Sequence, residues 1–146
     1  VCSSDLVVLA VPYYGKYDML EQAGPDSTFA EYLAEGVMPG PRDQHATPWK
    51  AMDPATQAAD PTAPRRPPFL VVHGQYDVLI PLAEARWFVK RLRDTSPDTE
   101  LIYVEMPYAQ HGFDVPHSLR AQLTVEAMQR YLEFQFSRWR AARGRA

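Results

Sequence analysis

Two side chains that can act together in proton transfer follow two apolar stretches of the chain. Asp77 lies in a loop after the run Phe69–Val72, and His111 lies 34 residues further along, after the run Leu101–Val104. In open α/β sheets, ligands and catalytic groups collect beyond the carboxyl ends of the strands. A carboxylate there can hold an imidazole in one tautomer, so that the imidazole takes a proton from a hydroxyl nucleophile. Each residue alone is more typical of an ordinary loop, but their joint placement makes them candidates for one site.

The elements that must position this pair form a predicted strand–helix–strand unit. The run Phe69–Val72 is typical of a strand buried on both faces, and Gly74 ends it. Residues Leu82–Arg93 predict an amphipathic helix, because apolar residues recur there at helical spacing: Leu82, Ala85, Val89 and Leu92. Charged residues are expected largely on the opposite face: Glu84, Arg86, Lys90, Arg91 and Arg93. The right-handed crossover of such a unit makes its two strands parallel, which brings the two loops to one edge of the sheet.

Further elements are predicted on both sides of this unit. In chain order they are a strand at Leu6–Tyr14, a helix at Asp26–Glu35, a short helix at Ala51–Ala59 capped by Asp53, and a long helix at Ser118–Arg138 capped by Ser118. Tyr13 and Tyr14 are interpreted as packing at the end of the first strand. Apolar residues flank the polar stripe of the last helix so broadly that this helix is expected to be mostly buried against the sheet.

Length and composition predict one globular domain. The chain has 146 residues, of which 46% are hydrophobic and 23% charged. We interpret residues 1–146 as a single, partial domain, in which residues 1–5 are a possible non-native leader. Residues 37–68 form a proline-rich connecting segment, which lies either over the catalytic edge or along the surface. The chain begins with Val1 and almost directly with a strand, so we expect a fragment.

Composition also argues against several kinds of partner and cofactor. The net charge of −3 gives no reason to expect a nucleic-acid partner, and the longest apolar run is far too short to span a bilayer. The single cysteine, Cys2, excludes an internal disulfide bond. No signal peptide is visible, and a cytoplasmic location is expected. The histidines show no metal-ligand spacing, so neither a metal nor another cofactor is expected.

Three motifs resemble the C-terminal half of the α/β-hydrolases, in the esterase and lipase branch related to hormone-sensitive lipase. They are PFLVVHGQYD at 68–77 with IP at 80–81, AQHGF at 109–113, and VPYYGKYD at 11–18. The resemblance implies an α/β fold, the C-terminal part of an α/β-hydrolase, with a mostly parallel sheet of about three strands flanked by helices. It also implies that Asp77 and His111 are the acid and the base of a Ser-His-Asp triad. In this family the chain order is nucleophile, acid, histidine, which puts the serine before the strand at Leu6–Tyr14.

No serine of the chain stands in a motif expected for the catalytic nucleophile. Ser3 and Ser4 lack the Gly-x-Ser-x-Gly turn and precede the wrong strand, and no glycine-rich stretch resembles the family's oxyanion loop. Asp114 is a rival acid, but it follows the histidine and so contradicts the family order. His73 is expected to pack or bond locally at the end of its strand. The remaining histidines, His45 and His117, belong to no motif.

The sequence therefore predicts that the parent protein is a carboxylic-ester hydrolase, acting on a small-molecule ester through an acyl-serine intermediate. This chain would supply the acid and base and would be inactive alone. It would stay in solution either by self-association through an exposed sheet edge or by the Gly36–Arg66 segment folding over that edge. One alternative is an acyl-peptide hydrolase of the prolyl oligopeptidase type. Another is a non-catalytic α/β-hydrolase relative that serves as a binding module.

Overall fold

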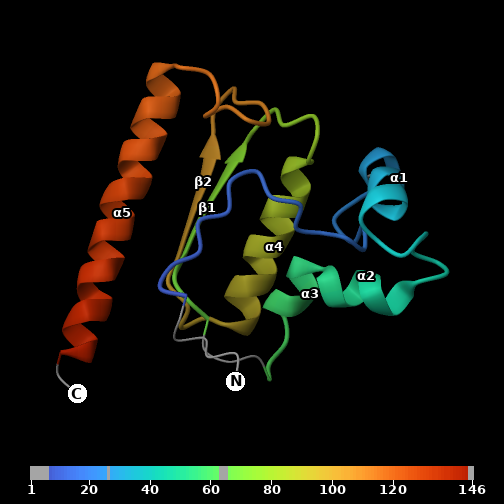
Figure 1. The fold of residues 1–146 in the computed structure, drawn as a ribbon, viewed down its shortest axis with the longest axis horizontal. Coiled ribbons are helices and arrows are strands. Elements are labelled where there is room, and N and C mark those ends of the chain that lie inside the picture. The colour runs from blue at the N-terminus through green and yellow to red at the C-terminus, as the bar shows by residue number, and fades with distance from the viewer. Residues whose placement is uncertain (1–6, 26, 63–65, 145–146) are drawn as a thin grey trace.

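The centre of the molecule is the strand–helix–strand unit that the sequence predicts (Figure 1). The computed structural model describes residues 7–25, 27–62 and 66–144. Strands β1 (Phe69–Gly74) and β2 (Leu101–Met106) are parallel, with Phe69 opposite Leu101 and Gly74 opposite Met106. Helix α4 (Leu82–Thr95) connects them. The predicted α/β class, parallel pairing and crossover helix are confirmed.

The predicted first strand is only partly formed. Leu6 lies outside the described residues, and the segment that follows pairs with β1 through isolated parallel bridges at Ala10 and Tyr13. Four backbone hydrogen bonds hold it there: Ala10 to Pro68, Leu70 to Ala10, Val72 to Pro12, and Tyr14 to Val72, at 2.8–3.0 Å. Pro12 has no N–H to donate, so a continuous ladder is interrupted at its position. The segment still takes the place of a third strand, on the side of β1 away from β2.

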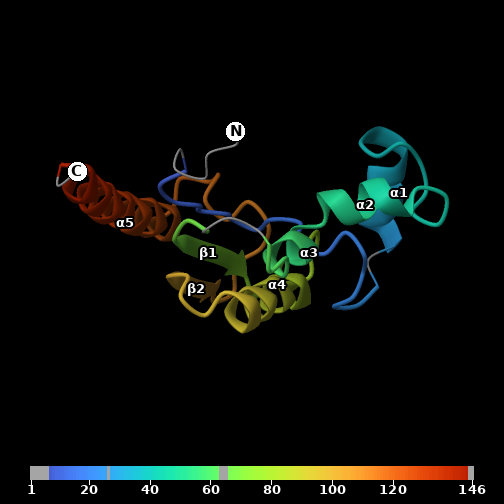
Figure 2. The same ribbon diagram turned by 90° about the horizontal axis from the view of Figure 1, so that it is seen from below.

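The two faces of the sheet carry different helices. Figure 2 shows the N-terminal segment, β1 and β2 in that order, with α4 beyond one face and α5 (Leu119–Arg143) beyond the other. On the α4 face, Val71 packs among buried apolar residues of the helix: Ala85, Phe88, Val89 and Leu92. On the α5 face, Leu70 and Val72 pack with Ala109 and Phe113. Alternation along β1 thus buries both faces of the strand, as expected for a central parallel strand.

Residues 27–62 form a small helical lobe beside α4. It contains α1 (Ser27–Gly36) and α2 (Ala46–Met52), which pack around the buried Trp49, and α3 (Pro54–Ala58), whose Ala58 packs with the buried residues of α4. The single short helix predicted at Ala51–Ala59 is therefore wrong. Asp53 interrupts it with ψ 110°, since a residue before proline avoids the helical region. The predicted cap is confirmed, because the Asp53 carboxylate accepts the Thr56 amide at 2.7 Å.

The lobe lies away from the catalytic edge. Thr95, at the end of α4 furthest from Asp77, donates its hydroxyl to the Ala58 carbonyl oxygen at 2.7 Å. Arg66 bonds the same carbonyl oxygen at 2.8 Å and Ser96 at 2.9 Å. The described part of the proline-rich segment thus follows α4 instead of covering the ends of the strands.

The final helix departs from its predicted burial. Its cap is confirmed, since Ser118 Oγ accepts the Ala121 amide at 3.1 Å, but α5 continues beyond the predicted end. Only three of its residues are buried: Ala121, Thr124 and Gln135. Its apolar residues are largely exposed: Leu119, Leu123, Val125, Leu132, Phe134 and Phe136. The apolar face is wider than two strands and one bridged segment can cover. A groove of about 540 Å³ separates the N-terminal half of α5 from the sheet.

Within the described ranges, no helix is long and apolar enough to cross a membrane. The same residues contain no group of three or more histidine, cysteine, aspartate or glutamate side chains placed to hold a metal ion.

Candidate active site

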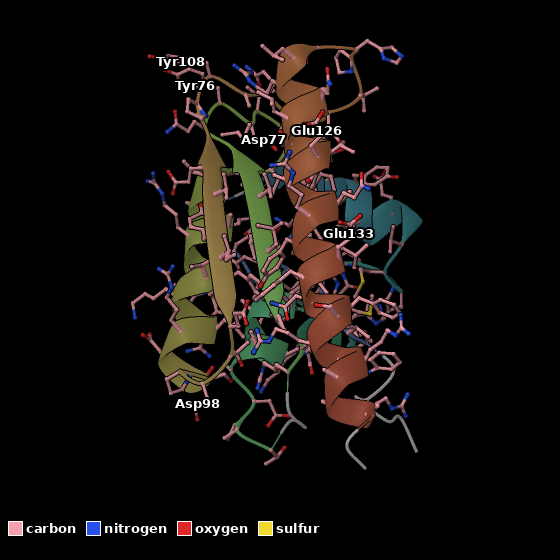
Figure 3. The ribbon with its side chains drawn as sticks, turned by 90° about the vertical axis from the view of Figure 1, so that its left-hand side faces the viewer. Tyr76, Asp77, Asp98, Tyr108, Glu126 and Glu133 are labelled. Carbon is pink, nitrogen blue, oxygen red and sulfur yellow. The ribbon has the colours of Figure 1, made fainter. Side chains whose placement is uncertain are left out.

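Asp77 and His111 meet where the two parallel strands end. His111 Nδ1 lies 2.9 Å from Asp77 Oδ2, which is the contact that the sequence predicts. The other carboxylate oxygen, Oδ1, accepts the amides of Leu79 at 2.9 Å and Ile80 at 2.8 Å. Because the side chain of Asp77 is fully buried, these bonds fix the direction in which its carboxylate faces. Figure 3 shows Asp77 at this end of the strands, with Tyr76 and Tyr108 beside it and Asp98 at the opposite end.

The backbones of the two loops are in direct contact. The Gln75 amide donates to the Met106 carbonyl oxygen at 3.0 Å, and the Tyr76 amide donates to the Ala109 carbonyl oxygen at 2.9 Å. A Cβ atom on Gly74 would lie 2.5 Å from that Ala109 oxygen, closer than real Cβ atoms come. The absence of a side chain at position 74 therefore allows the loops that carry Asp77 and His111 to approach each other.

His111 is arranged to act through its second ring nitrogen. A carboxylate oxygen can only accept, so Nδ1 donates its proton to Asp77 and the neutral ring keeps an unprotonated Nε2. The side chain is 30% exposed, whereas that of Asp77 is buried. Gly112 follows with φ +67°, a left-handed conformation that glycine adopts without strain. The His111 ring is thus accessible while its partner Asp77 is shielded from water.

His73 lies below the pair and bonds locally, as predicted. Its Nε2 donates to the Ile80 carbonyl oxygen at 3.0 Å and lies 3.5 Å from Asp77 Oδ2. Burial lowers the pKa of His73, although Ile80 and Asp77 oppose the shift. The ring is therefore a neutral donor to the same loop that carries the acid.

Asp114, the rival acid, is engaged elsewhere. Its Oδ1 accepts the hydroxyl of Tyr14 at 2.8 Å. Burial and the bond to Asp114 raise the pKa of Tyr14 to about 12. The Tyr14 ring packs against the His111 imidazole with 4.4 Å between ring centroids. Tyr14 thus contacts the base itself, which the sequence interpretation of this tyrosine as strand-end packing missed.

Glu84 does not lie on the exposed face predicted for it. It is 2% exposed, and it accepts Lys16 Nζ at 2.6 Å and the amides of Tyr17 at 3.3 Å and Asp18 at 3.1 Å. Burial raises the pKa of Glu84, whereas Lys16 and the two amides oppose the shift. The first turn of α4 thereby holds the loop that leads away from Tyr14. Helical periodicity gives no signal for this contact, because its partners come from a distant loop.

The three serines whose side chains the structure describes are each engaged in contacts other than with His111. Ser3 and Ser4 lie outside the described residues. Ser96 Oγ bonds Arg66 at the opposite end of the sheet, Ser118 caps α5, and Ser137 Oγ donates to the Phe134 carbonyl oxygen at 2.7 Å. Asp77 and His111 thus form a carboxylate–imidazole pair with an accessible nitrogen and no hydroxyl from these three serines beside it.

Comparison with known families identifies the relatives of this site. The profile of the prolyl oligopeptidase family matches residues 4–137, nearly the whole chain. The chain belongs to the prolyl oligopeptidase family. Three curated relatives from Mycobacterium tuberculosis carry esterase names. The probable carboxylic ester hydrolase LipM is 36% identical over 128 residues, esterase LipC 34% over 131, and esterase LipQ 32% over 142.

The matches to these relatives cover most of this chain but only a minor part of each relative. They cover 86%, 89% and 97% of this chain, but only 28%, 31% and 32% of the lengths of LipM, LipC and LipQ. The chain therefore spans about a third of each curated relative, or slightly less.

Solved structures support the same fold. Thermogutta terrifontis esterase 2 phosphonylated by sarin matches with a TM-score of 0.66 and 20% identity, over 86% of this chain and 43% of that one. Its propionate-bound form matches with a TM-score of 0.61 and 21% identity, over 86% and 42%. The resemblance to α/β-hydrolase esterases and lipases is confirmed, and the prolyl oligopeptidase type, first an alternative, is the family whose profile matches.

Proposed function

We propose that the protein containing this chain is a carboxylic-ester hydrolase that acts on small-molecule esters through an acyl-serine intermediate. The observation that carries the proposal is the 2.9 Å bond between the buried Asp77 carboxylate and the accessible His111 ring. The esterase names of the three curated relatives support the ester as substrate class. The nucleophilic serine, in this proposal, comes from a part of the protein outside these 146 residues.

The proposed steps need no cofactor. His111 Nε2 takes the proton of the serine hydroxyl while the serine oxygen attacks the ester carbonyl carbon, and a tetrahedral oxyanion forms. The C–O bond to the alcohol then breaks, and the same nitrogen returns the proton to the leaving alkoxide. Water, deprotonated by His111, then attacks the acyl carbon, the bond to the serine oxygen breaks, and His111 returns the proton to that oxygen as the carboxylic acid leaves. Asp77 holds the Nδ1 proton and stabilises the imidazolium in each half of the cycle.

The test uses the whole protein encoded by the reading frame that contains this chain. A fluorophosphonate probe should label one serine in a Gly-x-Ser-x-Gly sequence, and p-nitrophenyl esters of short acids should be hydrolysed. Asp77→Asn and His111→Ala should each lower kcat by roughly 10³–10⁴-fold. The matched controls Asp98→Asn and His117→Ala, both at exposed positions, should leave kcat unchanged. Labelling of Ser3 or Ser4, or full activity of the Asp77 and His111 variants, would refute the proposal.

The family profile favours a second candidate, the hydrolysis of acyl-peptides. The same acid and base would then serve a scissile amide, and His111 would protonate the leaving amine. The ratio of kcat/KM for a p-nitrophenyl ester to that for a blocked peptide anilide separates the two activities. Hydrolysis of neither substrate, with no serine labelled, would favour the non-catalytic binding module.

A further inference from the structure

Tyr14 has an unusual backbone conformation for its residue type. It lies at φ +37°, where the backbone of a tyrosine is strained. The next residue is Gly15, which could adopt a positive φ without strain, yet the positive φ falls on Tyr14. Its amide donates to the Val72 carbonyl oxygen at 2.8 Å, which fixes it beside the end of β1. Strained non-glycine residues persist where other contacts hold them, and they cluster at functional sites.

The contacts of the Tyr14 side chain account for the strain. Its ring lies 4.4 Å from the His111 ring, centroid to centroid, and 5.7 Å from that of Phe113. Its hydroxyl donates to Asp114 Oδ1 at 2.8 Å. The side chain therefore touches both the base and the loop after it, from a segment that lies nearly one hundred residues earlier in the chain.

Asp77 alone does not fix the base. One hydrogen bond at Nδ1 leaves the imidazole free to swing about that contact, and the neighbouring Gly112 gives its loop no side chain to pack. A ring packed on the imidazole, tied by a phenol–carboxylate bond to the same loop, removes this freedom. The raised pKa of Tyr14, about 12, keeps the phenol a donor at the pH of ordinary assays.

We propose that Tyr14 and Asp114 are positioning residues for His111, with the Tyr14 ring holding the imidazole plane and the Asp114 carboxylate holding the Tyr14 hydroxyl. The proposal rests on the proposed function, since it assigns these residues a role only if His111 is the base. Asp114 then acts on the base through Tyr14 and not as its acid partner.

The test measures kcat, KM and the urea midpoint of the whole protein for a series of variants. Tyr14→Phe keeps the ring and loses the hydroxyl, Tyr14→Ala loses both, and Asp114→Ala loses the acceptor. Misplacement of a reacting group by about 1 Å costs on the order of 100-fold in rate. We expect Tyr14→Ala to lower kcat about that much, and Tyr14→Phe and Asp114→Ala about 10-fold each, with KM within about 3-fold. Tyr32→Phe, at a 62% exposed position on α1, is the matched control.

Two comparisons separate positioning from a merely structural role. The double variant Tyr14→Phe with Asp114→Ala should lose no more activity than either single variant, because both remove one bond. Asp114→Asn, which retains an oxygen acceptor, should lose less than Asp114→Ala. Multiplicative losses, unchanged kcat, or losses that follow a lowered urea midpoint would overturn the proposal.

His111→Ala in the same series shows which proposal fails. If this variant keeps full activity, the proposed function is wrong and Tyr14 has no base to position. If it is inactive while the Tyr14 and Asp114 variants retain full kcat, only the positioning role is wrong.

Discussion

Gly74→Ala is the substitution that tests most directly how the site is held together. The added Cβ would meet the Ala109 carbonyl oxygen at 2.5 Å, its carbon at 2.9 Å and the Gln110 oxygen at 3.0 Å. All three atoms belong to backbone, so no side chain can rotate away. Ordinary contact begins near 3.4 Å, so the two loops must separate by about 0.9 Å, the difference between 3.4 and 2.5 Å.

The magnitude follows from what that separation disrupts. Inserting a methyl group into a closely packed site costs about 1–3 kcal/mol. The shift also stretches the 2.9 Å bond from Tyr76 to Ala109 and moves His111 away from Asp77. Misplacement of catalytic groups by about 1 Å costs on the order of 100-fold in rate. We therefore expect both a lower free energy of unfolding and a kcat lowered about 100-fold.

The assay pairs urea unfolding with ester hydrolysis, and Gly36→Ala is the control. Nothing lies within 4 Å of a Cβ atom on Gly36, which ends helix α1. That substitution should raise the free energy of unfolding by about 0.4–1 kcal/mol, because alanine loses less chain entropy on folding. It should leave kcat unchanged. If Gly74→Ala behaves like Gly36→Ala in both measurements, the close approach of the two loops is not what holds the site.

Three further outcomes are expected. Glu84→Gln should lower the free energy of unfolding by about 2 kcal/mol or more, since its NH2 group would face either Lys16 Nζ or the two backbone amides, donor against donor, in a buried site. By contrast, Lys90→Gln, in an exposed pair on the same helix, should change it by less than about 0.5 kcal/mol. Burial raises the pKa of Tyr17 to about 12 from 10.0, so the folded state holds this proton more tightly. The stability that depends on it is complete below pH 10 and is lost between about pH 10 and 12, by up to about 3 kcal/mol for two pKa units. Tyr17→Phe should remove this part of the alkaline loss in urea titrations at stepped pH, and an unchanged pH dependence would contradict it. Sedimentation of the 146-residue chain should show self-association that rises with concentration, and a monodisperse monomer would contradict it.

The strand–helix–strand unit could be predicted because it rests on local pattern and chain order, and the contact between Asp77 and His111 because the family resemblance singled out these two residues. Apolar runs ended by turn residues located β1 and β2, and the crossover rule brought their loops to one edge. The contact between Asp77 and His111 then needed no information from other segments. The order of the triad in the family that the chain resembles also favoured Asp77 over Asp114 as the partner of His111, and the hydrogen bonds agree.

Two kinds of cause explain the mistaken expectations: local prolines interrupt the predicted helix at Asp53 and the predicted first strand at Pro12, and contacts with distant segments explain the rest. Glu84 has the helical phase of an exposed residue, yet its partners Lys16, Tyr17 and Asp18 lie 66–68 residues away in the chain. The sequence shows that α5 has a wide apolar face, but it does not show whether other segments of the chain cover that face, and most of its apolar residues are exposed. Likewise, the backbone angle φ of +37° at Tyr14 depends on its tertiary contacts, and the residue type tyrosine does not predict it.

The acid–base pair is built entirely from contacts within this chain. The carboxylate is oriented by the Leu79 and Ile80 amides, and the loops are joined by backbone bonds at Gln75 and Tyr76. The carboxylate–imidazole contact therefore needs no segment outside the described residues. What the rest of a hydrolase would have to add is a hydroxyl beside His111 Nε2 and donors for the oxyanion. In the proposed enzyme, the pair is then formed before the nucleophile arrives, and catalysis depends on how accurately the serine is presented to a base that is already held in place.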